Sequence, residues 1–321
     1  MQKMASGKPQ KEKAFSLYNF STNYVSESNI SNLYPDLSPP VISHSVKSKL
    51  EELMNKSGLD KLVASEKDEH IYPYHHLVSS CENISSICKI QLSFFFFELV
   101  ELMKINYMIN TLENQSKSIL FVNADSFTEC TNFVSLYRNN VLNVFSTNIH
   151  DEIPPVRTNN EMDLIFMNNI SRLEYYAALN IIITHQSVGG SVFIKTSDLF
   201  YKQSVEFLSI LNSIYNQVLF VQPSISNALF GELFIICKNK MEISKMEISV
   251  CKSANNILPV HWPIHLLNKM EDMNLFFAKK QLEALLQYNA ENYDSIFTSF
   301  MVKSNISKCL NWCKGFQLPL K

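Results

Sequence analysis

Short apolar runs alternate with longer segments through the middle of the chain, and this alternation limits the possible folds more than any other feature. Four runs have the length of strands: Ser118–Ala124, Val141–Ser146, Asp163–Asn168 and Ser191–Thr196. The segments between and after them have the length of helices: Phe127–Tyr137, Arg172–His185 and Phe200–Ile214. Strands joined by helical crossovers lie parallel, so this order predicts an α/β fold with a mainly parallel sheet covered by helices on both faces.

The next two apolar runs break the alternation. Gln217–Gln222 and Glu232–Lys238 are separated only by the nine residues from Pro223 to Gly231. A crossover between parallel strands needs about a dozen residues or more. We therefore expect these two strands to pair antiparallel, at or near the edge of the sheet.

The two ends of the chain differ in composition from the middle. Residues 1–60 are rich in Ser, Asn, Pro and Lys and predict a largely irregular arm, with a short helix across Lys47–Lys56. We expect residues 61–250 to form the α/β domain and residues 251–321 a helical segment. Two C-terminal helices between His265 and Lys314 would pack against the sheet or bind a partner.

A long segment precedes the first predicted strand. Glu82–Leu112 mixes apolar and polar residues and contains the run Phe94–Phe97. Its length favours a helix, although the aromatic run alone would also suit a strand. The four phenylalanines are expected in the core rather than in a base-stacking surface.

Composition excludes several classes of protein. The net charge of −2 predicts no global attraction to nucleic acid, so an RNA site would have to be a local patch. No uninterrupted apolar stretch of ~18 residues could span a bilayer, and we expect a cytoplasmic protein without membrane contact. The seven cysteines form no C-x-x-C pair and predict buried thiols. The pairs His75/His76, His261/His265 and Cys309/Cys313 lack further ligands at useful spacing, so no metal is expected.

Two segments resemble a known family. Gly189–Phe200 resembles the Gly-Gly-x-x-x-x-Lys-x-x-x-Leu segment of FtsJ-like RNA ribose 2′-O-methyltransferases. Pro223–Lys238 is similar to that family's Pro-x-x-Ser-Arg…Glu-x-Tyr/Phe-x-x-x-Lys segment, with Asn227 in place of the Arg. The mRNA cap members are the most similar, since they also end in a helix with a Trp-Cys-Lys-like tail, here Trp312–Lys314. The resemblance implies a Rossmann-type methyltransferase fold with an antiparallel final strand.

The resemblance also implies a set of site residues. The family uses a Lys-Asp-Lys-Glu set, in which the second Lys takes the 2′-hydroxyl proton. Lys195 matches this second Lys and Glu232 the final Glu. Asn168 stands where the family has its Asp, and Glu98 where it has the first Lys.

These replacements change the charge of the set. Lys195 with Glu98 and Glu232 would carry a net charge of −1, whereas the family's set sums to about zero. Losing a cation and gaining an anion raises the pKa of a lysine, which is the wrong direction for a base near pH 7. We therefore expect Lys195 in an exposed salt bridge with Glu232, contributing only ~0–1 kcal/mol to stability.

The loop that would hold the methyl donor is also changed. The segment from Phe121 to Cys130 stands where the family has an acidic residue followed by Pro-Gly-Gly, and this chain has no glycine between Gly58 and Gly189. Glycine lets backbone amides approach S-adenosylmethionine closely. Asp125 and Ser126 remain as candidate cofactor contacts, and Phe127 is large enough to fill the pocket.

Three hypotheses follow. The first is a methyltransferase-fold protein without activity or cofactor, serving as a non-catalytic subunit of an mRNA capping or RNA-processing complex in the cytoplasm or virion of a virus. Its partners would be another protein and capped RNA. The second is an active, S-adenosylmethionine-dependent cap 2′-O-methyltransferase. The third is a structural or virion protein that retains only the scaffold.

Overall fold

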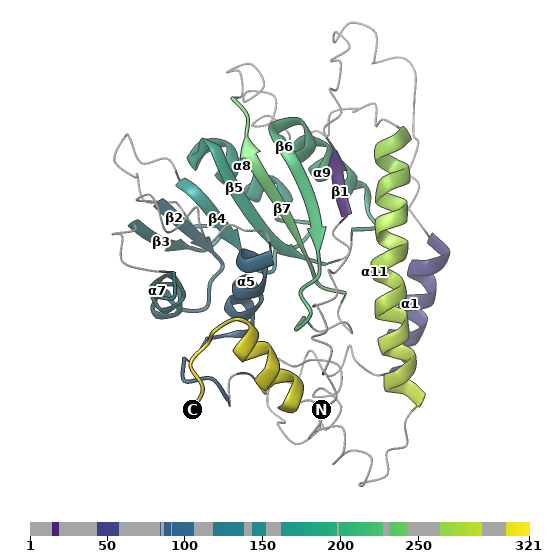
Figure 1. The fold of residues 1–321 in the computed structure, drawn as a ribbon. Helices are drawn as coiled ribbons and strands as arrows, with labels where there is room; N and C mark the ends of the chain where they lie inside the picture. Colours follow the sequence, from purple (N-terminus) through teal and green to yellow (C-terminus); the bar gives the residue numbers. More distant parts are fainter. Residues whose placement is uncertain are drawn as a thin grey trace, which may run out of the picture.

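A seven-stranded sheet forms the centre of the computed structural model (Figure 1). The structure describes residues 15–18, 44–57, 84, 87–90, 92–105, 118–137, 143–151, 162–197, 199–226, 231–242, 264–290 and 306–321. The strand order across the sheet is β1-β6-β7-β5-β4-β2-β3. The strands are β1 Phe15–Tyr18, β2 Ser118–Val122, β3 Asn143–Thr147, β4 Met162–Met167, β5 Gln186–Thr196, β6 Tyr215–Val221 and β7 Leu233–Lys240.

The directions of the strands confirm the predicted sheet. β2 pairs parallel with β3 and β4, and β4 pairs parallel with β5. The last strand, β7, lies antiparallel between β5 and β6, so the short connection from β6 to β7 does form a reversal. This mixed α/β arrangement is compatible with a Rossmann-type methyltransferase fold.

Helices cover both faces of the sheet, as the alternation predicted. Their bounds are α1 His44–Ser57, α5 Phe94–Ile105, α7 Phe127–Ser135, α8 Tyr175–His185, α9 Lys202–Ile214 and α11 Ile264–Ala290, with a further helix at 306–315. One core cluster joins the sheet to α8, α9 and α11, and a second joins the other face to α5, α7 and the segment 306–321. The two C-terminal helices therefore pack against the sheet. The predicted helix across Lys47–Lys56 is confirmed as α1, which packs on α11.

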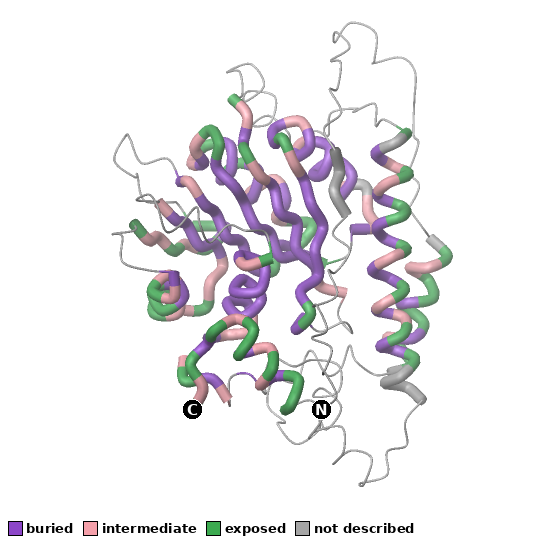
Figure 2. Tube along the Cα trace, in the orientation of Figure 1, coloured by how far each residue is buried: buried purple, intermediate pink, exposed green. Residues whose placement is uncertain are grey.

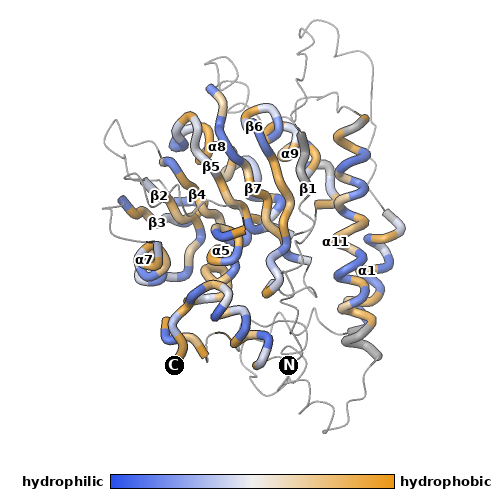
Figure 3. The backbone as a smooth tube through the Cα atoms, in the orientation of Figure 1, coloured by the Kyte–Doolittle hydropathy of each residue, from blue (hydrophilic) through white to orange (hydrophobic). Residues whose placement is uncertain are grey.

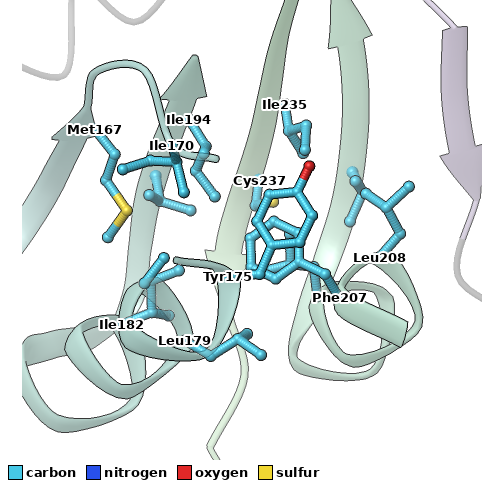
Figure 4. Close-up of a cluster of buried hydrophobic side chains, with 14 of the residues drawn as sticks. Met167, Ile170, Tyr175, Leu179, Ile182, Ile194, Phe207, Leu208, Ile235 and Cys237 are labelled. Carbon is cyan, nitrogen blue, oxygen red and sulfur yellow. The ribbon is translucent and has the colours of Figure 1, made fainter. Parts of the chain in front are cut away.

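The alternation of side chains along each strand divides the core between the two faces. In β4, Ile165 and Met167 belong to the cluster under α8, whereas Leu164 and Phe166 belong to the cluster under α5. Both sets are buried, as expected for a central parallel strand. Figure 4 shows the first cluster, in which Tyr175 stacks on Phe207 with ring centroids 4.2 Å apart. The central strands are buried along most of their length (Figure 2).

Two features of the N-terminal side were not predicted. Within the arm that was expected to be largely irregular, Phe15–Tyr18 forms β1, which pairs antiparallel with β6 at the edge of the sheet. The long segment from Glu82 is not one helix, because Cys88 forms an isolated bridge and Lys89 and Ile90 form a bend before α5 begins at Phe94. The aromatic run Phe94–Phe97 lies in α5, and Phe95, Phe96 and Phe97 are buried as expected.

Several predictions concern residues outside the described ranges. His75, His76, His261 and Asn227 are among them. In the part of the chain that the structure describes, no group of three or more His, Cys, Asp or Glu side chains could hold a metal ion. Within the same ranges, no helix is long and apolar enough to cross a membrane. The five described cysteines are all buried, which agrees with the expectation for the thiols.

Candidate functional site

Lys195 and Glu98 form a buried ion pair at the carboxyl end of the parallel strands. Lys195 is the penultimate residue of β5, and Glu98 lies on α5, which covers this face of the sheet. The Nζ atom of Lys195 is 2.8 Å from Oε2 of Glu98, and these side chains are 5% and 0% exposed. The structure therefore brings together two residues that the resemblance placed in one set.

Glu232 completes the cluster from the turn before β7. Its Oε2 atom is 2.9 Å from Nζ of Lys195, and its side chain is 24% exposed. Ser226, in the same β6–β7 connection, donates a 2.5 Å hydrogen bond to Oε1 of Glu98. The expected pairing of Lys195 with Glu232 is thus present, but the expectation of an exposed pair is wrong. α5 covers Lys195, so this lysine lies in a medium where unpaired charge is costly.

The electrostatics of the cluster oppose a role for Lys195 as a base. Burial pulls the pKa of Lys195 down, but the charges of Glu98 and Glu232 outweigh it and leave that pKa above its ordinary value. Burial raises the pKa of Glu98, and the charge of Lys195 only partly reverses this. The two carboxylates therefore favour the cationic form of Lys195, and its pKa is shifted in the direction that the replaced residues predicted.

Asn168 lies beside this cluster, directly after β4. The register pairs Met167 with Ile194, so one further residue places Asn168 next to Lys195. Its side-chain amide donates a 3.4 Å hydrogen bond to the carbonyl of Asn123, while its buried Oδ1 has no hydrogen-bond partner. An amide here supplies a dipole without a charge, so Asn168 cannot balance the cation of Lys195 as a carboxylate would.

Glu101 is a buried acid of this region that the sequence analysis missed. It lies one turn after Glu98 on α5 and is 2% exposed. Its Oε1 accepts a hydrogen bond from the backbone N–H of Ser224 at 2.7 Å. Its Oε2 accepts from the Ser224 hydroxyl and from Nε1–H of Trp312, each at 2.9 Å. Two acids three residues apart in a mostly apolar helix were the sequence signal for the buried Glu101 carboxylate.

The predicted donor loop serves as the start of a helix. Ser126 is the N-cap of α7, and its hydroxyl accepts a 3.2 Å hydrogen bond from the backbone N–H of Thr128. Asp125 is exposed. Phe127 is 54% exposed, so the expectation that its ring fills a pocket is not met.

The carboxyl ends of β2, β3 and β4 are tied directly to one another. Asn123 has a φ of 55°, and its Oδ1 accepts a 2.8 Å hydrogen bond from the backbone N–H of Ile149. Its amide donates to the carbonyl of Asn168 at 3.4 Å. The Asn123 side chain and the Ser126 hydroxyl therefore bind neighbouring backbone. These residues do not fit a cradle for S-adenosylmethionine, which needs backbone free to approach the ligand.

The Gly189–Gly190 pair has a structural reason. Gly189 has a φ of +79°, and a Cβ atom at Gly190 would lie 2.9 Å from the carbonyl oxygen of Ser187 and 3.0 Å from that of Asp163. The register of β4 with β5 shifts between Met162 and Leu164, beside this pair. Both glycines are thus required by the irregular start of β5, far along the strand from Lys195.

Comparisons with known proteins do not identify a family. No family model matches the chain, and no curated protein is similar in sequence. Among solved structures, a putative ribosomal RNA methyltransferase from Plasmodium falciparum has 14% identity and a TM-score of 0.35, and the match covers 47% of this chain and 99% of that one. The plantazolicin methyltransferase BpumL, in complex with SAH, has 12% identity and a TM-score of 0.27, covering 83% and 94%. Likenesses at this level decide nothing about activity, so the fold assignment rests on the sheet topology.

Proposed function

We propose that the protein is a methyltransferase-fold pseudoenzyme of the FtsJ-like kind, acting as a non-catalytic subunit in viral mRNA capping or RNA processing. One observation carries this proposal: Lys195 is locked as a cation between Glu98 and Glu232, 2.8 and 2.9 Å away. A lysine with a raised pKa cannot accept the 2′-hydroxyl proton near pH 7.

The donor side supports the same conclusion. The loop after β2 has no glycine, and its polar side chains at Asn123 and Ser126 bind neighbouring backbone. A chain that neither holds the donor nor activates the acceptor would contribute binding surface and structural support to a partner. The proposed location is the cytoplasm of the host or the virion.

Isothermal titration with S-adenosylmethionine tests this proposal directly. We expect no saturable binding up to millimolar donor. A dissociation constant in the low micromolar range would overturn the proposal and favour an enzyme. A second experiment is co-purification of the tagged protein from its natural source. If the proposal is right, a stoichiometric partner should be recovered with it, whereas a protein recovered alone would favour the scaffold hypothesis.

The second candidate is an active cap 2′-O-methyltransferase. The observation in its favour is that four residues from separate segments, which the resemblance assigns to the family's catalytic positions, meet at one end of the sheet. Methyl transfer to capped RNA by the wild-type protein, abolished in Asn168→Ala and in Lys195→Arg, would establish it. Both substitutions are chosen because they disturb the charge balance of the cluster less than removing the lysine does.

A further inference from the structure

The long helix α11 carries a line of exposed apolar side chains. Ile264, Leu275 and Leu286 are 76%, 43% and 49% exposed. They are eleven residues apart, which is close to three helical turns, so they lie along one side of the helix. Single exposed apolar residues are normal on a protein surface, but a line of them along one helix indicates a contact surface. We call this side the outer face of α11.

The other sides of α11 are occupied within the chain. The side toward the sheet is buried in the first core cluster and consists of Leu266, Met270, Met273 and Phe277. The side toward α1 is buried against that helix and consists of Ala278, Ala284 and Leu285. Figure 1 shows α11 at one side of the molecule, with α1 beside part of its length. Exposed and buried positions alternate along α11 in Figure 2, and hydrophilic and hydrophobic stretches alternate along it in Figure 3.

Opposite charges flank the middle of the outer face. Glu271 is four residues before Leu275, and Lys279 is four residues after it. Both charged side chains are exposed. The ammonium group of Lys279 lies 4.0 Å from a carboxylate oxygen of Glu283 on the same helix, and both side chains of this pair are exposed. Because solvent and salt weaken such a surface pair, Lys279 can also bind an acid of another molecule.

The outer face of α11 is complementary to itself in the antiparallel direction. When a second copy of the helix is laid antiparallel with Leu275 on the twofold axis, Leu275 meets its own copy. Ile264 then lies level with Leu286 of the second copy, because each is eleven residues from the axis. Glu271 lies level with Lys279 of the second copy, because each is four residues from the axis. The twofold axis produces each of these two contacts twice.

The charges determine the direction of the pairing. In a parallel pair of the same helices, Glu271 would lie level with its own copy and Lys279 with its own copy, and like charges repel. In the antiparallel pair, each acid lies level with a base and each apolar residue of the line with an apolar residue. A different protein would have to carry this same pattern on a helix of its own, whereas a second copy of this chain already carries it.

We propose that two copies of this protein associate through α11 as an antiparallel, twofold-symmetric helix pair centred on Leu275. This inference goes beyond the proposed function and does not depend on it. α11 packs on one face of the sheet, and α5, which covers Lys195, packs on the other. The dimer therefore does not use the face of the sheet that carries the Lys195 cluster. One helix pair is small for a protein interface, so we expect a dissociation constant in the micromolar range.

Sedimentation equilibrium of the full chain at about 1 to 200 µM tests this proposal. We expect a reversible equilibrium between monomer and dimer for the wild type. Leu275→Asp places two carboxylates together at the twofold axis and should leave only monomer. The matched control is Leu173→Asp, because Leu173 is 83% exposed and lies outside α11, so this variant should dimerise like the wild type. Circular dichroism of both variants would check that they are folded.

Charge reversal tests the antiparallel direction. Glu271→Lys alone and Lys279→Glu alone should each raise the dissociation constant on the order of 10-fold or more, because each places like charges level with one another on both sides of the axis. A mixture of the two single variants should associate again, since a lysine then lies level with an acid at both contacts. The double variant, Glu271→Lys with Lys279→Glu, should dimerise like the wild type for the same reason.

Several outcomes would overturn the inference. They are a wild type that stays monomeric at every concentration, a dimer that Leu275→Asp leaves intact, and single charge variants that do not associate when they are mixed. A dimer that neither single charge reversal weakens would also overturn the antiparallel pairing. Donor titration is independent of all these results, because an enzyme and a pseudoenzyme could each be a monomer or a dimer.

Discussion

The two halves of the sheet's carboxyl end are built in different ways. On the side of β5 and β7, Lys195 pairs with Glu98 and Glu232 in an ionic cluster under α5. On the side of β2 and β3, the loop after β2 has no glycine and its polar side chains bind neighbouring backbone. The first half therefore holds a charged cluster, whereas the second half is closed by hydrogen bonds to the backbone.

Burial makes the two halves differ in what a substitution costs. A charged side chain under α5 cannot be removed without leaving its partners unpaired in a medium of low dielectric constant. Asp125 and Phe127 are exposed, so changes there cost the fold little. The Lys195 cluster therefore has a structural role of its own, and its presence alone is no evidence of activity.

The largest effect should come from Lys195→Ala. This change leaves Glu98 and Glu232 without their cation, and truncating one partner of a buried pair costs ~3–5 kcal/mol. We expect the free energy of unfolding in urea to fall by about that amount. Lys49→Ala on α1 is the control, because Lys49 pairs with Glu52 in solvent and its loss should change stability little. Equal effects of the two substitutions would show that the cluster contributes no more than a surface pair.

A smaller and pH-dependent effect is expected for Glu98→Gln. Glutamine keeps a hydrogen-bond partner for Ser226 and leaves Lys195 paired with Glu232. The free energy of unfolding should therefore fall by less than it does in Lys195→Ala. Because the folded pKa of Glu98 lies above the unfolded value of 4.5, wild-type stability falls as pH rises through the interval between them. Glutamine does not ionise, so the free energy of unfolding of the variant should rise relative to that of wild type as pH increases from 4.5. Urea titrations at a series of pH values would measure this difference, and a constant difference would contradict the raised pKa.

Trp312→Phe should lower the free energy of unfolding by less than Lys195→Ala does. It removes one hydrogen bond to the carboxylate of Glu101, and bonds to charged groups contribute ~1.5–3 kcal/mol. A decrease in the free energy of unfolding of this size would show that the C-terminal helix stabilises the β6–β7 connection. Asn311→Ala, at an exposed neighbour on the same helix, should leave stability nearly unchanged.

Most of the fold could be predicted from the sequence, because a chain of apolar runs separated by helix-length segments is compatible with few folds. The reversal at β7 followed from a nine-residue connection. β1 could not be predicted, because Phe15–Tyr18 is short and lies within polar sequence, and its pairing with β6 is a tertiary contact. The start of α5 at Phe94 was also missed, since composition before it differs little from that of a helix.

The resemblance grouped residues that the structure brings together, but it did not predict their burial, and their role as a functional site stays a prediction. The resemblance located Lys195, Glu232, Asn168 and Glu98, yet a strand-end lysine is normally solvated, and only the path of α5 covers it. Glu101 was missed because its role depends on two distant partners, Ser224 and Trp312. Contacts over such separations leave no local pattern in the sequence.

The smallest effect is expected on the donor side, from Ser126→Ala. The hydroxyl of Ser126 caps α7 through the N–H of Thr128, and loss of an N-cap side chain costs ~1 kcal/mol. Asp125→Asn is the matched control. Asp125 is exposed, so this substitution should change the free energy of unfolding by no more than about 0.5 kcal/mol. If Ser126 is only a cap, titration with S-adenosylhomocysteine should be the same for wild type and both variants. If the wild type binds S-adenosylhomocysteine and either substitution weakens that binding tenfold, the loop holds a donor. Both halves of the sheet end would then contribute to one site.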